Sequence, residues 1–470
     1  MSIVARAGRP PSGVRARVPD DVARLATARR LRGTLRVPGD KSVSHRALLL
    51  AALARGTSRI SGAGDGEDVR ATARLIEALG VDVERRPTAG GRLIDYEVVS
   101  PGPDGLTEPR DVLDCGNSGT SLRLLAGILA GRPWTSVLTG DASLRRRPVG
   151  RVVLPLRAMG ADVHARRSDT LPPLAVAGRA RLRPIDWTTD VPSAQVKSAI
   201  LLAGLAADGP TTVAEMVATR DHTERMLRAR GVPVETVRGP SGAVRVTIEG
   251  GQAVATVDET VPGDVSAAAF WLVAAAIHPD AELRIDGVGL NPTRTAIVGL
   301  LRRMGGDVER LASDGRPVAN VEAADDGRGE PTGSLVARSS ALRAIEVSAD
   351  EVAAAIDEIP ILCLAASQAD GVTTISGIGE LRVKESDRVA GIAEGLGGLG
   401  ARVDVDGNVM RIHGPARLRG ARLDALGDHR LAMTFAVAGL RAEGETTIAG
   451  SSTASISYPG FFDDLTRVVS

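Results

Sequence analysis

Two cations flank the start of an apolar helix near the N-terminal end of the chain. Residues 38–53 read Pro-Gly-Asp-Lys-Ser-Val-Ser-His-Arg, followed by an apolar run. Asp40 or Ser42 can cap this helix by accepting a hydrogen bond from one of its first amides. Lys41 and Arg46 add positive charge where the free amides and the helix dipole already attract anions, which suits a phosphate or a carboxylate. A capped helix with solvated cations is the alternative reading of this stretch in isolation.

The same order of polar turn, apolar helix and short strand recurs along the chain. Six copies close at positions 62, 140, 215, 287, 377 and 450. Most copies also contain a second amphipathic helix that breaks at a glycine, as at Gly80 and Gly160, which is typical of a left-handed helix cap. Such regularity indicates a repeat architecture, and six units over two domains gives three units in each.

The sixth copy ends without a following strand. The strand-like segment 31–37 precedes the first copy and could complete the sixth, which would place both ends of the ordered chain in one domain. Residues 314–332, rich in Gly, Asp and Pro, form an insertion. We therefore predict a disordered extension over 1–30, a first domain over 41–260, and a second domain made of 31–40 plus 261–470.

The overall composition excludes several classes of protein. A chain of 470 residues favours two domains, and 43% apolar with 24% charged residues is ordinary for a globular protein. A net charge of +1 and only 2% aromatics argue against a nucleic-acid or anionic membrane surface. Cys115 and Cys363 form no disulfide framework and no metal cluster, which favours a reducing cytoplasm. No segment is long enough to span a bilayer.

Several cations and carboxylates come from far-apart turns of the repeat. If the apolar helices run parallel, two facing domains would aim six helix starts into one cleft. Arg147 lies in an arginine cluster that would repel itself unless an anion visits it. The run 380–388 reads as the opening of a helix, with Lys384 and Arg388 one turn apart. With Asp357 nearby, acid and base groups beside cations indicate proton transfer on a multiply anionic substrate.

These motifs resemble the 5-enolpyruvylshikimate-3-phosphate synthase family, from about Leu31 to the C-terminus. The matching motifs are Pro38-Gly-Asp-Lys-Ser-Val-Ser-His-Arg46, Gly116-Asn-Ser-Gly-Thr120, Arg147-Pro, Ser193-Ala-Gln195, Thr219-Arg-Asp-His-Thr-Glu224, Asn291-Pro-Thr-Arg-Thr295, Asp357-Glu-Ile-Pro, Arg382-Val-Lys-Glu-Ser-Asp-Arg388 and Asp428-His-Arg430. Two of them, Ser-Ala-Gln-Val-Lys and Thr-Arg-Asp-His-Thr-Glu, look like the bacterial class II branch. The resemblance implies two inside-out α/β domains, each a threefold repeat of a βαβαββ unit, with the active site in the interdomain cleft.

The resemblance also implies a reaction and its residues. The enolpyruvyl group of phosphoenolpyruvate would pass to the 5-hydroxyl of 3-phosphoshikimate through a tetrahedral intermediate, without a cofactor or a metal. The implied contacts to 3-phosphoshikimate are Lys41, Ser42, Arg46, Ser193, Ala194, Gln195, Arg220, Asp357 and Lys384. The implied contacts to phosphoenolpyruvate are Lys41, Gly119, Arg147, Gln195, Arg388 and Arg430. Asp357 or Lys384 would deprotonate the hydroxyl, and Glu385 would protonate the enol methylene. Lys41 completes the implied catalytic set. Nearby cations favour the neutral, basic form of Lys384.

Some positions depart from the family pattern. Glu380 and Ile456 stand where class I members carry Asn and Lys, so those contacts do not transfer. Gly119 occupies the position where herbicide-tolerant class II members carry Ala, so we expect glyphosate to inhibit this protein.

Three rival functions compete with this reading. The UDP-N-acetylglucosamine enolpyruvyl transferase uses a cysteine in a mobile glycine-rich loop, whereas neither Cys115 nor Cys363 lies in such a sequence. Cys115 is either a nucleophile or a small buried apolar residue. A catalytically silent phosphometabolite-binding protein could lose Asp357, Lys384 and Glu385, yet all three are present. An RNA-terminal-phosphate enzyme would need a basic surface.

We expect a cytoplasmic monomer.

Overall fold

The chain folds into two compact units, each with its own apolar core. The structure, a computed structural model, describes residues 15–17, 21–88, 93–239, 242–318 and 327–469. Of these, unit 2 comprises Gly39–Pro262 together with 327–330, and unit 1 comprises the remainder. Residues 327–330 follow strand β17 of unit 1, and the sequence predicts them in the second domain. They pack instead with unit 2, because they contact helix α7.

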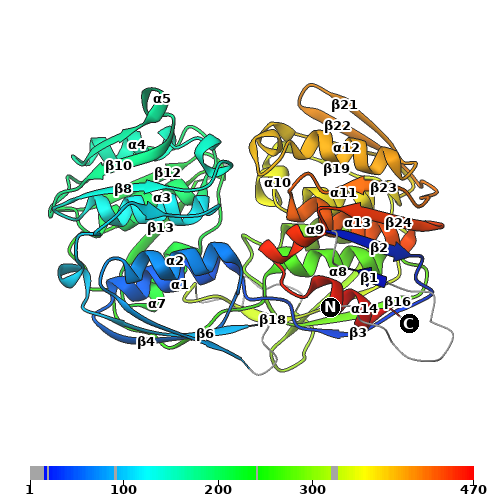
Figure 1. The fold of residues 1–470 in the computed structure, drawn as a ribbon, viewed down its shortest axis with the longest axis horizontal. Coiled ribbons are helices and arrows are strands. Elements are labelled where there is room, and N and C mark those ends of the chain that lie inside the picture. Colours follow the sequence, from blue (N-terminus) through cyan, green and yellow to red (C-terminus); the bar gives the residue numbers. More distant parts are fainter. Residues whose placement is uncertain (1–14, 18–20, 89–92, 240–241, 319–326, 470) are drawn as a thin grey trace. The chain divides into compact units, whose positions relative to one another are not determined.

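Unit 2 contains three four-stranded sheets with one shared topology, in the blue-to-green half of Figure 1. In each sheet the first two strands are parallel and the last two are antiparallel to their neighbours. The helices are α1 (Lys41–Leu53), α2 (Glu67–Glu77), α3 (Gly119–Ala130), α4 (Gly150–Ala158), α5 (Arg166–Asp169), α6 (Ala194–Gly204), α7 (His222–Ala229) and the 3₁₀ helices η1 (Pro103–Gly105) and η2 (Leu144–Arg146). The strands are β4 (Gly56–Ala63), β5 (Asp82–Pro87), β6 (Ile94–Ser100), β7 (Leu113–Asp114), β8 (Thr135–Thr139), β9 (Asp162–Ala165), β10 (Leu171–Ala177), β11 (Asp186–Thr188), β12 (Thr211–Glu215), β13 (Val234–Arg238), β14 (Val244–Ile248) and β15 (Glu259–Thr260).

Unit 1 repeats this arrangement with three further sheets. Its helices are α8 (Val265–Ile277), α9 (Ala296–Arg303), α10 (Ala349–Ala354), α11 (Ile359–Ser367), α12 (Arg388–Gly398), α13 (His429–Arg441), α14 (Phe461–Val468) and the 3₁₀ helices η4 (Ile378–Val383) and η5 (Ser451–Ile456). Its strands are β1 (Arg15–Arg17), β2 (Val22–Ala26), β3 (Leu31–Leu35), β16 (Ala281–Gly289), β17 (Asp307–Ala312), β18 (Thr332–Arg338), β19 (Glu346–Val347), β20 (Gly371–Ser376), β21 (Arg402–Asp406), β22 (Val409–Gly414), β23 (Arg422–Asp424) and β24 (Glu445–Ala449). The predicted threefold repeat of a βαβαββ unit is confirmed.

The sixth sheet is completed by the N-terminal strands β1 and β2. Both views place β2 beside β24, and the two strands pair antiparallel from Val22 with Ala449 to Ala26 with Glu445. The prediction of a disordered extension over 1–30 is therefore wrong for β1 and β2; residues 1–14 and 18–20 lie outside the described ones. The prediction that 31–37 completes the sixth sheet is also wrong, because β3 pairs parallel with β16 of the fourth repeat. Alternating Leu25 and Ala23, both buried, anchor β2 to the core.

Two strands are exchanged between the first and fourth repeats. Strand β3 precedes α1 along the chain but pairs with β16, and β15 precedes α8 but pairs with β4. The turns that follow are locked by reciprocal hydrogen bonds. The Asp40 amide donates to the Pro262 carbonyl at 2.7 Å, and the Asp264 amide donates to the Pro38 carbonyl at 2.8 Å. Each turn then leads directly into a buried helix.

The apolar helices lie inside their units, as their composition predicts. All residues of α8 are buried, and α1 is buried from Val43 to Leu53. Polar side chains satisfy the first amides of these helices: Asp40 accepts from Val43, Ser118 from Ser121, Ser193 from Val196, Asp264 from Ser266 and Asp428 from Arg430. Replacing such a cap by Ala typically costs about 1 kcal/mol. The caps therefore fix where each buried helix begins, and with it the polar residues of its first turn.

Candidate active site

In unit 2, the starts of α1, α3 and α6 carry the residues expected to bind substrate. Lys41, Gly119 and Ala194 are the first residues of these three helices. The Nζ of Lys41 lies 3.1 Å from the Asp68 carboxylate. Gln195 joins α6 to α3, because its Nε2 donates to the Thr120 hydroxyl at 2.9 Å. The structure thus brings these predicted residues together at one end of the unit.

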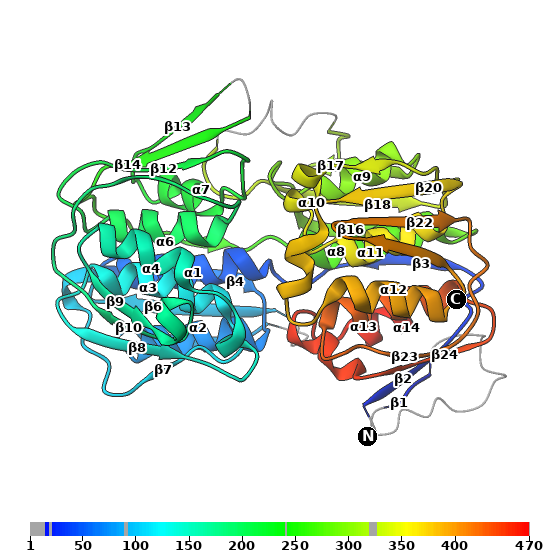
Figure 2. The same cartoon turned by 90° about the horizontal axis from the view of Figure 1, so that it is seen from above.

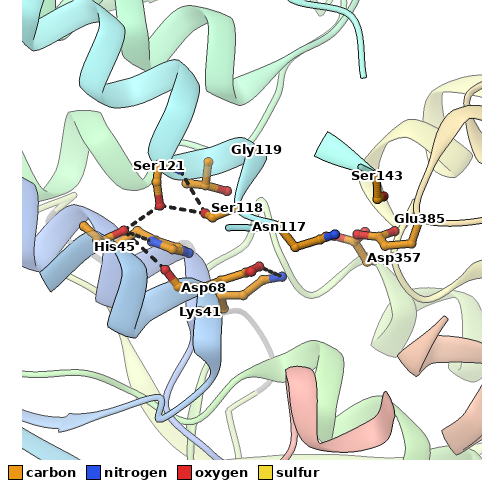
Figure 3. A network of polar contacts seen from close by, with 12 residues as sticks. Lys41, His45, Asp68, Asn117, Ser118, Gly119, Ser121, Ser143, Asp357 and Glu385 are labelled. Atoms are coloured by element: carbon orange, nitrogen blue, oxygen red, sulfur yellow. Dashed lines mark hydrogen bonds and ion pairs between the residues drawn. The ribbon is translucent and has the colours of Figure 1, made fainter. Parts of the chain in front are cut away.

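A chain of hydroxyls connects three helices behind this surface. The Nδ1 of His45 lies 2.6 Å from the Thr72 hydroxyl, which lies 2.6 Å from Ser121, which in turn donates to Ser118 at 2.7 Å (Figure 3). Burial lowers the pKa of His45 from 6.5 to about 3, so the imidazole is neutral at neutral pH. The nearby Asp68 raises this pKa and Lys41 lowers it, both by less than burial does. His45 therefore acts as a neutral hydrogen-bonding link and carries no charge toward an anion.

Arg46 is buried and holds α1 against α6 and α7. Its Nε donates to the Thr223 hydroxyl at 2.8 Å, and one Nη donates to the Ser198 hydroxyl at 2.8 Å. Burial lowers its pKa to about 10, which still leaves it charged at neutral pH. Among the nearby charges, Glu224 and Glu330 raise this pKa and Arg220 lowers it, all by less than burial does. The predicted phosphate ligand is thus also a link between helices.

Arg123 is a contact residue that the sequence analysis did not identify. It lies one turn after Gly119 on α3, and its Nη1 donates to the Gln195 Oε1 at 2.5 Å. Its Nη2 donates to the Pro148 carbonyl at 2.9 Å. The neighbouring Arg147 donates to the Asn117 side-chain oxygen at 2.6 Å, a neutral acceptor that leaves the charge of the arginine cluster in place. The spacing of four residues from Gly119 was the available signal, since it places Arg123 on the same helix face.

The loop before α7 carries Arg220 and is anchored by buried charges. Glu215, at the end of β12, accepts a hydrogen bond from the Thr219 hydroxyl at 2.5 Å. The Lys197 Nζ lies 2.8 Å from both Glu215 and Glu224, and these side chains are at most 2% exposed. Burial alone would lower the pKa of Lys197, but the two carboxylates outweigh it and raise the pKa. Ser193 and Ala194, also expected at the substrate, are the cap and the first residue of α6, and Ser42 follows Lys41 in α1.

In unit 1, Arg388 is the centre of a buried ionic network. Its Nε lies 2.7 Å from Asp428, its Nη2 lies 2.7 Å from Glu385, and its Nη1 lies 3.6 Å from Asp357. Burial would lower the pKa of Arg388, but these three carboxylates outweigh burial and raise it. Burial would raise the pKa of Asp428, and Arg388 more than offsets this, so the Asp428 pKa is lowered. The three predicted residues Asp357, Glu385 and Arg388 are therefore adjacent. Arg388 and Asp428 are both ionised at neutral pH, because each favours the charged form of the other.

Lys384 and Arg430 complete the predicted set in unit 1. Arg430 is in the first turn of α13 and is 4% exposed, and its buried Nε has no hydrogen-bond partner among the described residues. Lys384 follows the 3₁₀ helix η4, and α12 begins only at Arg388. The prediction that Lys384 and Arg388 share a helix is wrong, because Asp387 caps α12 by accepting from the Ala390 amide at 3.1 Å. Lys384 is thus on a turn rather than on a helix face.

A second buried arginine in unit 1 also lacked a predicted role. Arg294 donates to Ser266 at 2.7 Å and lies 3.1 Å from Asp264, the cap of α8. Ser266 in turn donates to Glu358, which precedes α11. These contacts join the starts of α8 and α11 in the way that Arg388 and Asp428 join α12 and α13. The Asn291-Pro-Thr-Arg-Thr295 motif was the signal for this residue.

Neither cysteine has the surroundings of a nucleophile. Burial raises the pKa of Cys115 to about 12, with Asp114 adding to the shift, and burial also raises the pKa of Cys363. Both thiols are buried, which fits the reading of Cys115 as a small apolar residue. The described residues contain no cluster of His, Cys, Asp and Glu arranged to hold a metal ion. No helix among the described residues has the length and apolar character needed to cross a membrane.

Fold and residues together define a class: a two-unit α/β protein of βαβαββ repeats whose buried helices begin at cationic and carboxylate side chains. Residues 25–465 match the family described as EPSP synthase (3-phosphoshikimate 1-carboxyvinyltransferase), and the chain belongs to this family. This range begins inside β2, at Leu25, whereas the resemblance began at Leu31.

Curated relatives and solved structures agree with this assignment. The 3-phosphoshikimate 1-carboxyvinyltransferase of Geobacter sulfurreducens is 48% identical over 441 residues, covering 94% of this chain and 97% of that protein. The namesake from Halorhodospira halophila is 48% identical over 445 residues, covering 95% of each chain. The EPSP synthase structure from Acinetobacter baumannii is 38% identical, with a TM-score of 0.82, and covers 95% of this chain and 98% of that one. The enolpyruvyl transferase NikO from Streptomyces tendae, at 21% identity and a TM-score of 0.73, shares the fold.

Proposed function

We propose that this protein transfers the enolpyruvyl group of phosphoenolpyruvate to the 5-hydroxyl of 3-phosphoshikimate and releases inorganic phosphate. The observation that carries the proposal is the group Asp357, Glu385 and Arg388, in which two carboxylates flank a buried guanidinium. Family membership and the cation-lined helix starts of unit 2 support it. The reaction draws on residues of both units.

Phosphoenolpyruvate carries a carboxylate and a phosphate, both of which suit bidentate arginines. Arg388 and Arg430 supply two buried guanidinium groups in unit 1. In unit 2, Arg147, Lys41, Gln195 and the Gly119 amide supply further donors. Gly119 is the first residue of α3, so its amide is among those that no carbonyl of the helix satisfies. The helix dipole there adds a favourable field for an anion.

The 3-phosphate and the hydroxyls of the acceptor would contact polar residues at the starts of α1 and α6. Lys41, Ser42, Ser193, Ala194 and Gln195 lie in these first turns or at their caps. Arg220 lies in the loop before α7, and its charge lowers the pKa of Arg46, so the two guanidinium groups could act together on a dianionic phosphate.

Asp357 and Lys384 are the candidates for removing the proton of the 5-hydroxyl. The hydroxyl oxygen then bonds to C2 of phosphoenolpyruvate while Glu385 delivers a proton to C3, giving a tetrahedral intermediate. Loss of a proton from C3 and breakage of the C2–O bond to phosphate complete the transfer, and all atoms and charges balance without a cofactor. Arg388 lies 2.7 Å from Glu385 and thereby fixes the carboxylate that would serve C3. We also propose that the protein is a cytoplasmic monomer.

The test is release of inorganic phosphate from phosphoenolpyruvate with 3-phosphoshikimate or UDP-N-acetylglucosamine as acceptor. We expect release only with 3-phosphoshikimate, and a loss of at least about 100-fold in Lys384→Met, as for removal of an acid–base group. Lys384→Arg should be similarly inactive, because it keeps the charge but cannot give up its proton. Arg382→Met, an exposed cation two residues earlier, is the matched control and should retain activity.

Two outcomes would change the assignment. Release only with the sugar nucleotide would overturn the acceptor and return attention to Cys115. Binding of both ligands without release from either acceptor would favour a silent binding protein.

A further inference from the structure

Residues 327–330 make a set of contacts that the proposed function does not use. They lie between β17 and β18 of unit 1 along the chain, yet they pack on α7 of unit 2. The Gly329 amide donates to the Arg225 carbonyl at 3.3 Å, and Arg228 donates to the Gly327 carbonyl at 3.5 Å. A side chain of this segment also takes part: the Glu330 carboxylate lies 2.8 Å from the Nδ1 of His222.

This side-chain pair is almost completely removed from solvent. The His222 side chain is 1% exposed and the Glu330 side chain 5%. A carboxylate this buried is costly unless hydrogen-bonded, so the pair holds residues 327–330 and the first turn of α7 together. The next two residues of α7 are also engaged, since Thr223 accepts from Arg46 and Glu224 binds Lys197. The start of α7 is thus fixed by three consecutive side chains bound to three different elements.

The loop carrying Arg220 is held at both of its ends. On the N-terminal side, Glu215 and Lys197 bind Thr219, the residue just before Arg220. On the C-terminal side, His222 is bound by Glu330. Only Arg220 and Asp221 lie between these anchors. The backbone on both sides of Arg220 is therefore held by two buried clusters, one of which depends on a carboxylate from outside the loop.

We infer that Glu330 is a positioning residue for the acceptor phosphate: through His222 it holds the start of α7 so that Arg220 is aligned for the 3-phosphate. The inference rests on the proposed function, in which Arg220 binds that phosphate. Glu330 itself touches no reacting atom. Because Glu330 binds His222, directly after the loop that carries Arg220, we expect its effect to fall on acceptor binding.

The experiment compares Glu330→Ala and Glu330→Gln in steady-state kinetics. We expect Glu330→Ala to raise the KM for 3-phosphoshikimate roughly tenfold, the size of one lost coupling, with kcat and the KM for phosphoenolpyruvate nearly unchanged. Glu330→Gln should recover part of this loss, because its amide oxygen can still accept from His222. Asp314→Asn is the matched control, since Asp314 is an exposed carboxylate in the same β17–β18 connection.

A double-mutant cycle with Arg220→Ala tests the route of the effect. If Glu330 acts through Arg220, the double variant should have a KM for 3-phosphoshikimate no higher than that of Arg220→Ala. Hydrogen exchange provides a readout independent of turnover: amides of residues 219–226 should exchange faster in Glu330→Ala and not in Asp314→Asn.

Each result bears on one claim. An active wild type whose KM for 3-phosphoshikimate is unchanged by Glu330→Ala would overturn the inference and leave the proposed function intact. The inference would also be overturned if the increases in the KM for 3-phosphoshikimate caused by Glu330→Ala and Arg220→Ala multiplied in the double variant. Equal increases in the KM of both substrates in Glu330→Ala would overturn it too. An inactive wild type would overturn the proposed function, and unchanged exchange in Glu330→Ala would then refute the anchor as well.

Discussion

Removing the guanidinium of Arg388 should destabilise unit 1 as well as abolish activity. The Arg388 side chain is 1% exposed and lies 2.7 Å from Asp428, whose side chain is fully buried. In Arg388→Met the methionine can fill much of the space, but the Asp428 carboxylate loses its counter-ion. The perturbation therefore tests whether the network is a structural element of the unit or only a binding surface.

The size of the effect follows from what remains around Asp428. Breaking a buried ion pair by removing one partner typically costs about 3–5 kcal/mol. Asp428 keeps hydrogen bonds from the Arg430 amide at 2.8 Å and from Ser386 at 3.2 Å. We therefore expect the lower end, about 3 kcal/mol, which corresponds to a fall of about 1 M or more in the urea midpoint. Adding Asp428→Asn removes the stranded charge, so the double variant should recover most of this loss while staying inactive.

The assay must report unit 1 separately, because two units need not unfold together. Trp271 is buried in the core of unit 1, whereas Trp134 and Trp187 belong to unit 2. In a background with Trp134→Phe and Trp187→Phe, Trp271 fluorescence during urea unfolding follows unit 1. A midpoint for Arg388→Met within about 0.2 M of its parent would refute the reasoning, since the expected shift is about 1 M. A double variant as unstable as the single one would refute the role given to the stranded carboxylate.

Two further predictions concern unit 2. The pKa of His45 is about 3 in the folded state against 6.5 as its ordinary value, so the unfolded chain binds more protons between these pH values. The contribution of His45 to the free energy of unfolding is complete above pH 6.5 and falls as the pH is lowered, by about 1.4 kcal/mol at pH 5.5. In urea unfolding at a series of pH values, His45→Asn should make the free energy of unfolding depend less on pH. An unchanged pH dependence would contradict the assignment. In Gly119→Ala the new Cβ would lie 2.8 Å from the Arg123 guanidinium, a flexible group that can shift. We expect the KM for phosphoenolpyruvate to rise about fivefold with no loss of unfolding free energy, since Ala is preferred over Gly in a helix; an unchanged KM would show that this contact does not matter for binding.

Local chemistry made the helix starts predictable from sequence. A cap depends on residues within one turn, so Asp40 could be placed as a candidate for α1. The predicted glycine breaks at Gly80 and Gly160 correspond to left-handed backbone with φ of 88° and 99°. Apolar composition likewise predicted the burial of α8. Repeats of the same local pattern then gave the number of units. These inferences need no knowledge of which distant segments pair.

Pairing between distant segments is what the sequence could not supply. The strand character of 31–37 was readable, but its neighbour in the sheet was not, because a parallel partner is chosen by the path of the whole chain. The hairpin of β1 and β2 was missed because its arginine-rich sequence has no long apolar run. Within β2, Ala23 and Leu25 are the buried residues. His222 and Glu330 are 108 residues apart, and nothing near either residue indicates the other.

The distribution of lysine supports the division between fixed and proton-transferring cations. The chain has 58 Lys and Arg residues, and only three of them are Lys: Lys41, Lys197 and Lys384. Arginine is permanently charged and suits bidentate anion binding, whereas lysine is compact and can release its proton. Lys197 needs compactness, since its ammonium lies 2.8 Å from two buried carboxylates. Lys384 needs the removable proton if it is the base. A chain that uses arginine almost everywhere else thus keeps lysine at Lys41 and Lys384 of the proposed site and at Lys197, which anchors the loop carrying Arg220. This pattern is expected if the Lys197 anchor matters for acceptor binding.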